Sequence, residues 1–262
     1  MYNHYFAGTI DITEMVLYLF FAFFLALVIY LQREGMREGF PVEDDVTGKL
    51  DRSPDFLYRD EPKAYKMSDG TTLYKPDFTR DTHATSSKRT AAWSGSPIEP
   101  TGNPLTAGVG PGAYAMRADV PDMTSHGTTR IAPLRVATDY FTDPKDAQLV
   151  GMGLVGIDNK SGGTITDIWI DRAEFLIRYL EVATINNDGT ATGKTVLVPM
   201  TMCAVQKASK TVLLDAVLGG QVSGAPQVAN ATQVTLLEEE KIVGYFGAGY
   251  LYATAARAEP AL

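Results

Sequence analysis

Several residue types that build metal sites and disulfides are scarce in this sequence. Its 262 residues include one cysteine, Cys203, and three histidines, His4, His83 and His126. A single cysteine excludes an intramolecular disulfide and a metal cluster held by cysteines alone, and the histidines lie too far apart for a zinc-ligand motif. We therefore predict no metal site on this chain, and a reduced, buried Cys203.

Basic residues are also few, and the first 32 positions contain none. The chain carries 23 Lys and Arg against 31 Asp and Glu, which gives a formal net charge of −8. Phosphate contacts supply most of the affinity of nucleic-acid binders, so an acidic chain without a basic stripe is not expected to bind nucleic acid.

Motifs of catalysis are missing as well. No Gly-x-Ser-x-Gly sequence is present. Gly151-Met-Gly-Leu-Val-Gly156 matches the dinucleotide fingerprint literally, and Asp171 follows about 20 residues after its start. The fingerprint needs a helix directly after the glycines, whereas the residues that follow here predict a turn and another strand. We therefore predict strand glycines, no nucleotide site and no catalytic residues.

The N-terminus contains a long apolar run instead. All 17 residues from Met15 to Leu31 are apolar or aromatic, and about 20 helical residues cross the hydrocarbon layer of a bilayer. We predict a transmembrane helix over residues 11–32. A cleavable signal peptide would need basic residues before the apolar core, and a buried globular helix would be polar on one face.

Positive charge lies on one side of this predicted helix. Arg33 and Arg37 follow it, so the positive-inside rule places residues 1–10 in the periplasm and the rest of the chain in the cytoplasm. Tyr30, Arg33 and Arg37 are expected to contact lipid headgroups or a partner subunit, with anionic lipid as the counter-charge.

Residues 33–129 are predicted to be largely extended. Phe40-Pro41 breaks regular structure, and residues 65–74 predict a short hairpin with its turn at Asp69-Gly70. Residues 95–114 contain four prolines and five glycines, which excludes a helix or a central strand there. We expect a partner surface to order this Gly/Pro-rich segment.

Residues 130–262 have a different pattern, with several short strands separated by turn-rich breaks. The strands are predicted at 131–137, 149–157, 164–171, 177–185, 194–199 and 211–216. Such spacing is typical of a small antiparallel barrel or sandwich.

One amphipathic helix of about three turns is predicted near the C-terminus, over residues 235–246. Gly247 and Gly249 are expected to loosen it. We interpret the acidic run 238–240 as its solvated face.

A group of charged residues is interleaved with apolar ones in the middle of this region. Its members are Asp167, Asp171, Glu174, Arg178 and Glu181. Two interpretations are open: a set of surface salt bridges, or a chain of coupled proton-exchanging groups beneath a membrane partner.

Seven segments, taken in order, resemble a known family. They are Tyr30-Leu-Gln-Arg-Glu-Gly-Met-Arg-Glu-Gly-Phe-Pro41, Pro100-Thr-Gly-Asn-Pro-Leu105, Gly108-Val-Gly-Pro-Gly-Ala-Tyr114, Ile131-Ala-Pro-Leu-Arg-Val136, the strand pair Thr166-Asp-Ile-Trp-Ile-Asp171 and Ile177-Arg-Tyr-Leu-Glu-Val182, Val234-Thr-Leu-Leu-Glu-Glu-Glu-Lys-Ile-Val-Gly-Tyr245, and Gly249-Tyr-Leu-Tyr-Ala253. The chain resembles the H subunit of the purple-bacterial photosynthetic reaction centre. Residues 42–95 show no correspondence.

The resemblance implies a single transmembrane helix and a mainly β cytoplasmic domain, a small antiparallel PRC-type barrel with a C-terminal amphipathic helix. It implies a non-catalytic subunit of the photosynthetic inner membrane that caps the L and M subunits, shields the quinone region and conducts protons to the secondary quinone. Bacteriochlorophyll, bacteriopheophytin, quinones and non-haem iron belong to the complex, and this chain alone is expected to bind none of them. A cytochrome subunit and a light-harvesting antenna are further partners that the sequence leaves open.

The resemblance also implies roles for individual residues. Glu174 falls where the family has a carboxylate near the proton route, with Asp171 and Arg178 beside it. Some members carry an acid and a His-x-His pair at the proton inlet, whereas this chain keeps only Asp122 and His126, which makes a weaker inlet. The alternative function is a membrane-tethered barrel acting as a stand-alone binding module, and an anchored enzyme comes third.

Overall fold

The computed structural model describes most of the chain, apart from short ranges near the ends and between residues 38 and 82. The described residues are 5–7, 10–37, 42–44, 46–47, 49, 61–68, 70–75, 77 and 83–258. They form two compact units, of which one takes in Met1–Thr82 and Ala91–Ser96 and the other His83–Thr90 and Pro97–Leu262. His4, Phe40-Pro41 and Asp69 lie outside the described residues.

The first unit contains the long apolar helix α1, Ile12–Gly35. A short strand pair, β1 (Tyr5–Ala7) and β2 (Ile10–Asp11), precedes it. The Asp11 side chain caps the helix by accepting a hydrogen bond from the Glu14 backbone N–H at 2.8 Å. The most apolar stretch of α1 has a mean hydropathy of 2.4 and contains no buried residue. The predicted apolar helix is confirmed, and it is long enough to cross a bilayer.

The same unit contains the predicted hairpin. Strand β3 (Lys63–Lys66) pairs antiparallel with β4 (Thr72–Lys75), and the Gly70 N–H donates to the Met67 carbonyl at 3.1 Å in the turn. The strand pair of this hairpin is therefore confirmed.

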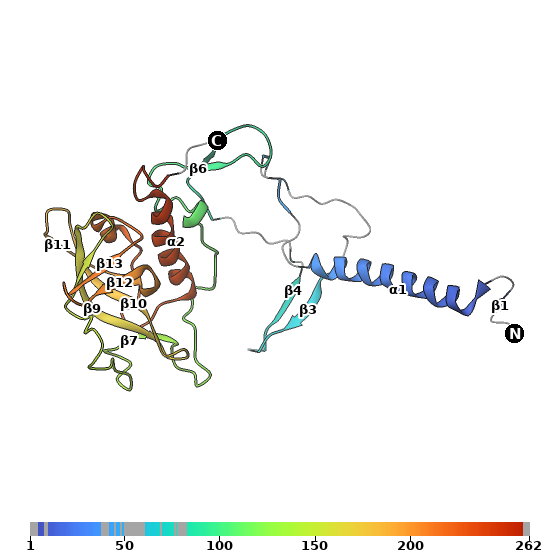
Figure 1. Cartoon of the computed structure of the whole chain (residues 1–262), viewed down its shortest axis with the longest axis horizontal. Coiled ribbons are helices and arrows are strands. Elements are labelled where there is room, and N and C mark those ends of the chain that lie inside the picture. Colours follow the sequence, from blue (N-terminus) through green and yellow to red (C-terminus); the bar gives the residue numbers. More distant parts are fainter. Residues whose placement is uncertain are drawn as a thin grey trace. The chain divides into compact units, whose positions relative to one another are not determined.

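The second unit is built on a seven-stranded sheet (Figure 1). Its strands are β7 (Ile131–Pro133), β8 (Gly153–Val155), β9 (Ser161–Asp171), β10 (Leu176–Ile185), β11 (Ala191–Pro199), β12 (Cys203–Gln206) and β13 (Thr211–Leu214). They are ordered β11-β10-β9-β8-β13-β12, and β7 pairs with β9. The mainly β domain is confirmed.

Two details of the predicted strands were wrong. The sheet is not wholly antiparallel, because β13 pairs in parallel with β8. The prediction also missed strand β12, which begins at Cys203, lies between β11 and β13 in the sequence and pairs antiparallel with β13. Burial raises the pKa of the Cys203 thiol to about 12, which disfavours the reactive thiolate.

The glycines of the dinucleotide-like motif serve the sheet, as expected. β8 lies inside the motif, and a turn then leads directly into β9 instead of a helix. A side chain at Gly156 would collide with the backbone of Leu218 and Gly219. This glycine is therefore explained by the close approach of two chain segments.

The C-terminal helix α2, Leu236–Tyr252, is longer than predicted. It continues through Gly247 because this face of the helix packs against the 3-10 helix η1, Gly110–Gly112. A Cβ on Gly247 would lie 2.8 Å from the Pro111 carbonyl oxygen, and one on Gly244 would lie 3.1 Å from the Gly112 oxygen. The glycines permit this close packing and do not end the helix.

This packing also corrects the expectation that only a partner surface orders the Gly/Pro-rich segment. Leu105, Ala107 and Val109 are all buried within the chain itself, and strands β5 (Ser87–Arg89) and β6 (Ile98–Pro100) pair antiparallel. The compact unit that contains the sheet therefore begins at His83, whereas we expected a domain boundary at 129–130.

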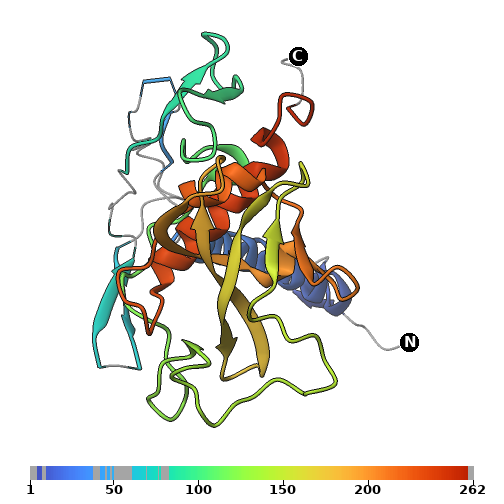
Figure 2. The same ribbon diagram turned by 90° about the vertical axis from the view of Figure 1, so that its left-hand side faces the viewer.

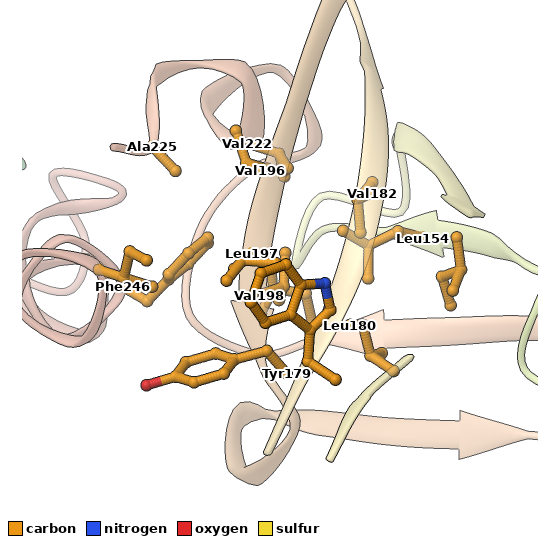
Figure 3. Packing of buried hydrophobic residues seen from close by; sticks show 14 of the residues in the cluster. Leu154, Tyr179, Leu180, Val182, Val196, Leu197, Val198, Val222, Ala225 and Phe246 are labelled. Carbon is orange, nitrogen blue, oxygen red and sulfur yellow. The ribbon is translucent and has the colours of Figure 1, made fainter. Parts of the chain in front are cut away.

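The hydrophobic core lies between α2, the sheet and the 3-10 helix η3, Gly219–Gly224 (Figures 2 and 3). Trp169, Leu180, Val198 and Phe246 are each fully buried, and burying a side chain of this size contributes about 1.5–3 kcal/mol. In Figure 3 the ring of Tyr179 lies at the edge of this cluster with its hydroxyl directed out of it.

Candidate functional site

The turn between β9 and β10 presents Glu174, and Asp171 builds this turn. The Asp171 Oδ1 atom accepts hydrogen bonds from the backbone N–H groups of Ala173 at 2.9 Å and Glu174 at 3.1 Å. Phe175 then takes a left-handed conformation with φ of 57°, which is uncommon for a residue with a side chain. The Glu174 side chain is left 50% exposed.

Arg130 joins three carboxylates at this turn. Strand β7 pairs Ile131 with Asp171, which places Arg130 beside the end of β9. The Arg130 Nε atom lies 3.0 Å from Asp171 Oδ2, and its two terminal nitrogens lie 3.1 Å from Asp122 and 2.5 Å from Glu174. We call these four residues the Arg130 cluster.

Asp171 is the buried member of the Arg130 cluster, with a side chain that is 0% exposed. Burial by itself would raise the pKa of Asp171, but the hydrogen bonds from Arg130 and from two backbone N–H groups outweigh it and lower the pKa. The bond to Asp171 also raises the pKa of Arg130. The cluster therefore holds a buried carboxylate in its charged form.

A second arginine joins the remaining carboxylates of the predicted group. Asp167 and Glu181 lie directly opposite each other on β9 and β10, an arrangement that is repulsive for like charges. Arg135 Nη1 bridges them at 2.7 and 2.8 Å, and its Nη2 donates to the Ala231 carbonyl. We call Arg135, Asp167 and Glu181 the Arg135 cluster.

The Arg135 cluster includes a hydrogen bond from a neutral side chain and lies beside a cavity. The indole Nε1 of Trp169 donates to Glu181 at 2.7 Å. A cavity of about 300 Å³ lies beside the cluster, with Arg135, Trp169 and Glu181 among its lining residues.

A further carboxyl, Glu239 on α2, is half-buried and lies outside both clusters as defined. Its Oε2 atom accepts a hydrogen bond from the Tyr179 hydroxyl at 2.9 Å. Burial raises the pKa of Glu239, while the Tyr179 hydrogen bond and the charges of Arg178 and Arg117 act in the opposite direction. Asp122 adds its negative charge to the raising effect, so Glu239 is electrostatically connected to the Arg130 cluster.

The structure brings together three of the predicted relay residues and leaves out two. Asp122, Asp171 and Glu174 meet at Arg130. The positive charge of Arg178 instead acts to lower the pKa of Glu239 and of Tyr179. His126 is exposed at the tip of a tight turn, where the Thr124 N–H donates to the Thr128 carbonyl at 2.8 Å.

Residues 238–240 are half-buried, so they form a solvated face only in part, and each carboxylate has a partner on the chain. Glu238 accepts from the Thr235 backbone N–H at 2.9 Å in a capping box. Glu239 accepts from Tyr179, and Glu240 lies 3.5 Å from Arg117.

The residues predicted at the membrane flank have different surroundings. Tyr30 is 56% exposed, and Arg33 lies in the last turn of α1. The Arg37 side chain is only 13% exposed and pairs with Glu34 at 3.1 Å, while it also donates to the Glu61 carbonyl at 2.7 Å. Arg37 thus stabilises the end of α1, and contact of Tyr30, Arg33 and Arg37 with lipid or a partner stays a prediction.

Sequence reasoning missed three residues of the candidate site. Arg130 and Arg135 are separated from their partners Asp171 and Asp167 by 41 and 32 positions, and no local pattern indicates such pairing. Glu239 had a usable signal, since it lies three and seven residues before the buried Ile242 and Phe246 on one helix face.

Metal-ligating side chains do not gather at these clusters. In the part of the chain that the structure describes, no group of three or more His, Cys, Asp or Glu residues is arranged to hold a metal ion.

Two family models match the chain. Residues 4–136, just over half of the chain, match the model described as the photosynthetic reaction centre H-chain N-terminal region. Residues 145–220, which include β8 to β13, match the PRC-barrel domain. The apolar helix, the mainly β domain and these two matches agree with one another, and the chain belongs to the family of photosynthetic reaction centre H chains.

Proposed function

We propose that this chain caps the L and M subunits of its reaction centre and conducts protons from the cytoplasm to the secondary quinone through the Arg130 cluster. Pigments, quinones and non-haem iron would be held by the partner subunits. In this proposal α1 spans the inner membrane with residues 1–10 in the periplasm, because Arg33 and Arg37 follow its C-terminal end.

One observation carries the proton-conducting role. Arg130 connects Glu174, which is half exposed, to Asp171, which is fully buried, through contacts of 2.5 and 3.0 Å. A reduced quinone takes up protons away from bulk water, so a continuous set of ionisable groups from the surface inward is the device such a reaction needs.

The test of this role is the substitution Glu174→Gln, which keeps the size of the side chain and removes its proton exchange. We expect the second flash-induced electron transfer to the quinone to slow by about tenfold or more, because proton delivery limits it. A matched control is Glu99→Gln, since Glu99 also pairs with a basic residue, Lys88, at 3.5 Å but lies outside the cluster. An unchanged rate in Glu174→Gln would remove the proton-conducting role.

The stand-alone binding module is the competing function. The Gly/Pro-rich segment does not decide between the two, because part of it packs on α2 of the same chain. Extraction in mild detergent through a tag on this chain is expected to recover near-infrared-absorbing pigment, and a colourless monomer would favour the module.

A further inference from the structure

A proton carrier must take up and release its proton near the working pH, and the Arg130 cluster is poorly suited to do so alone. Asp122, Asp171 and Glu174 are all hydrogen-bonded to one guanidinium. The hydrogen bonds from Arg130 and from two backbone N–H groups hold Asp171, the buried member, in its ionised form. The cluster can stabilise a passing positive charge, but its buried carboxylate resists holding the proton itself.

Glu239 has the opposite surroundings. It is half-buried on α2, and it accepts a hydrogen bond from a neutral phenol, that of Tyr179. Within the described ranges the nearby guanidinium of Arg117 forms its ion pair with Glu240 instead. A half-buried carboxyl with a neutral donor gains less from ionisation than one bonded to arginine.

Charged and titratable groups from several elements act on the Glu239–Tyr179 pair. Tyr179 and Arg178 come from β10, Arg117 and Asp122 come from the segment before β7, and Glu240 follows on α2. The backbone of that segment is joined to the start of α2, since the Leu236 N–H donates to the Val120 carbonyl at 3.0 Å. Asp122 therefore belongs both to the Arg130 cluster and to the surroundings of Glu239.

We propose that Glu239 is a proton-exchanging residue of the route, which holds a proton as a neutral carboxyl beside the Arg130 cluster. The inference rests on the proposed function. In each transfer the O–H bond of the Glu239 carboxyl breaks, an O–H bond forms on Asp122 or on an intervening water, and solvent reprotonates Glu239. No electron moves on this chain, because the quinone receives its electrons from the partner subunits.

The protonation of Glu239 can be measured on the full chain without its partners. Burial raises the pKa of Glu239 above the ordinary value of 4.5, so infrared spectra recorded during a pH titration in detergent should contain a carboxylic C=O band that persists above that pH. The band should disappear in Glu239→Gln and remain in Glu240→Gln, the matched control on the same helix. A titration unchanged by Glu239→Gln would overturn the inference.

Its role in the route is tested in the assembled reaction centre. Flash-induced proton uptake should slow about tenfold in Glu239→Gln and be unchanged in Glu99→Gln, whose carboxylate pairs with Lys88 away from this site. If uptake is unchanged in Glu239→Gln but slow in Glu174→Gln, the inference fails while the proposed function stands. If both variants are unchanged, the proposed function fails as well.

A second variant leaves the carboxyl in place. Tyr179→Phe removes the hydrogen bond that lowers the pKa of Glu239, so the carboxyl band and the pH profile of proton uptake should both move to higher pH. A purely structural role of Glu239 would leave the pH profile where it is, and that result would also overturn the inference.

Discussion

The two arginine clusters use the same strand pair and the same chemistry but differ in depth. The Arg130 side chain is 26% exposed and its partner Asp171 0%, whereas Arg135 is 40% exposed and Asp167 12%. Each arginine flanks or follows β7, and each bonds carboxylates of β9. A fully buried carboxylate cannot replace its guanidinium by water, whereas a partly exposed carboxylate can.

Arg130→Met should lower the stability of the chain more than any other change proposed here. The substitution leaves the buried Asp171 carboxylate without its guanidinium, and breaking a buried pair in this way costs about 3–5 kcal/mol. The measurement is the free energy of unfolding of the full chain by guanidinium chloride in detergent, followed by near-UV circular dichroism. If Arg130→Met lowers the free energy of unfolding by less than Arg135→Met does, the comparison is contradicted.

Arg135→Met should have a smaller effect, about 1–2 kcal/mol, because its partner carboxylates are 12% and 14% exposed and water can reach them. Asp167 retains the Ile168 backbone N–H at 2.8 Å, and Glu181 retains the Trp169 indole at 2.7 Å. The same unfolding experiment measures it, with tryptophan fluorescence as a second probe because Trp169 is fully buried. If the two arginine variants lose equal stability, burial depth is not what separates the clusters.

The smallest expected effect is a dependence of stability on acid pH. The pKa of Asp171 in the folded chain lies below the ordinary value of 3.8, so the unfolded chain binds this proton first as the pH falls. The contribution of Asp171 is therefore complete above the ordinary pKa and is lost as the pH falls through the folded value. Unfolding curves recorded from pH 6 downward should have a weaker pH dependence in Asp171→Asn than in the unsubstituted chain, and an equal dependence would contradict this assignment.

Local patterns were sufficient for most of the secondary structure. The unbroken run 15–31 predicted α1, and the alternation of apolar residues predicted β9, β10 and β11. The end of α2 was missed because glycine is a poor helix former in isolation, and nothing local indicates that η1 packs against Gly244 and Gly247. Helix propensity is a property of the single residue, but whether α2 continues through its glycines depends on η1, a segment more than 100 positions away.

The candidate site was only partly accessible from the sequence. The charged group gave Asp171, Glu174 and Arg178 as candidates, and the family resemblance gave them and Asp122 their expected roles. Arg178 was expected beside Glu174, yet Arg130 takes that place through the pairing of β7 with β9. The register of two paired strands determines which charged side chains meet, and no short stretch of the sequence indicates that register.

The apolar helix, the mainly β domain and the acidic character of the chain could be predicted from the sequence, because they follow from composition and from periodicity within short windows. The pairing of each arginine with its carboxylates, the depth at which Asp171 is buried and the hydrogen bond from Tyr179 to Glu239 became known from the tertiary structure alone. Charge pairing and burial arise from contacts between distant segments, and these same contacts determine which of the carboxyls can hold a proton.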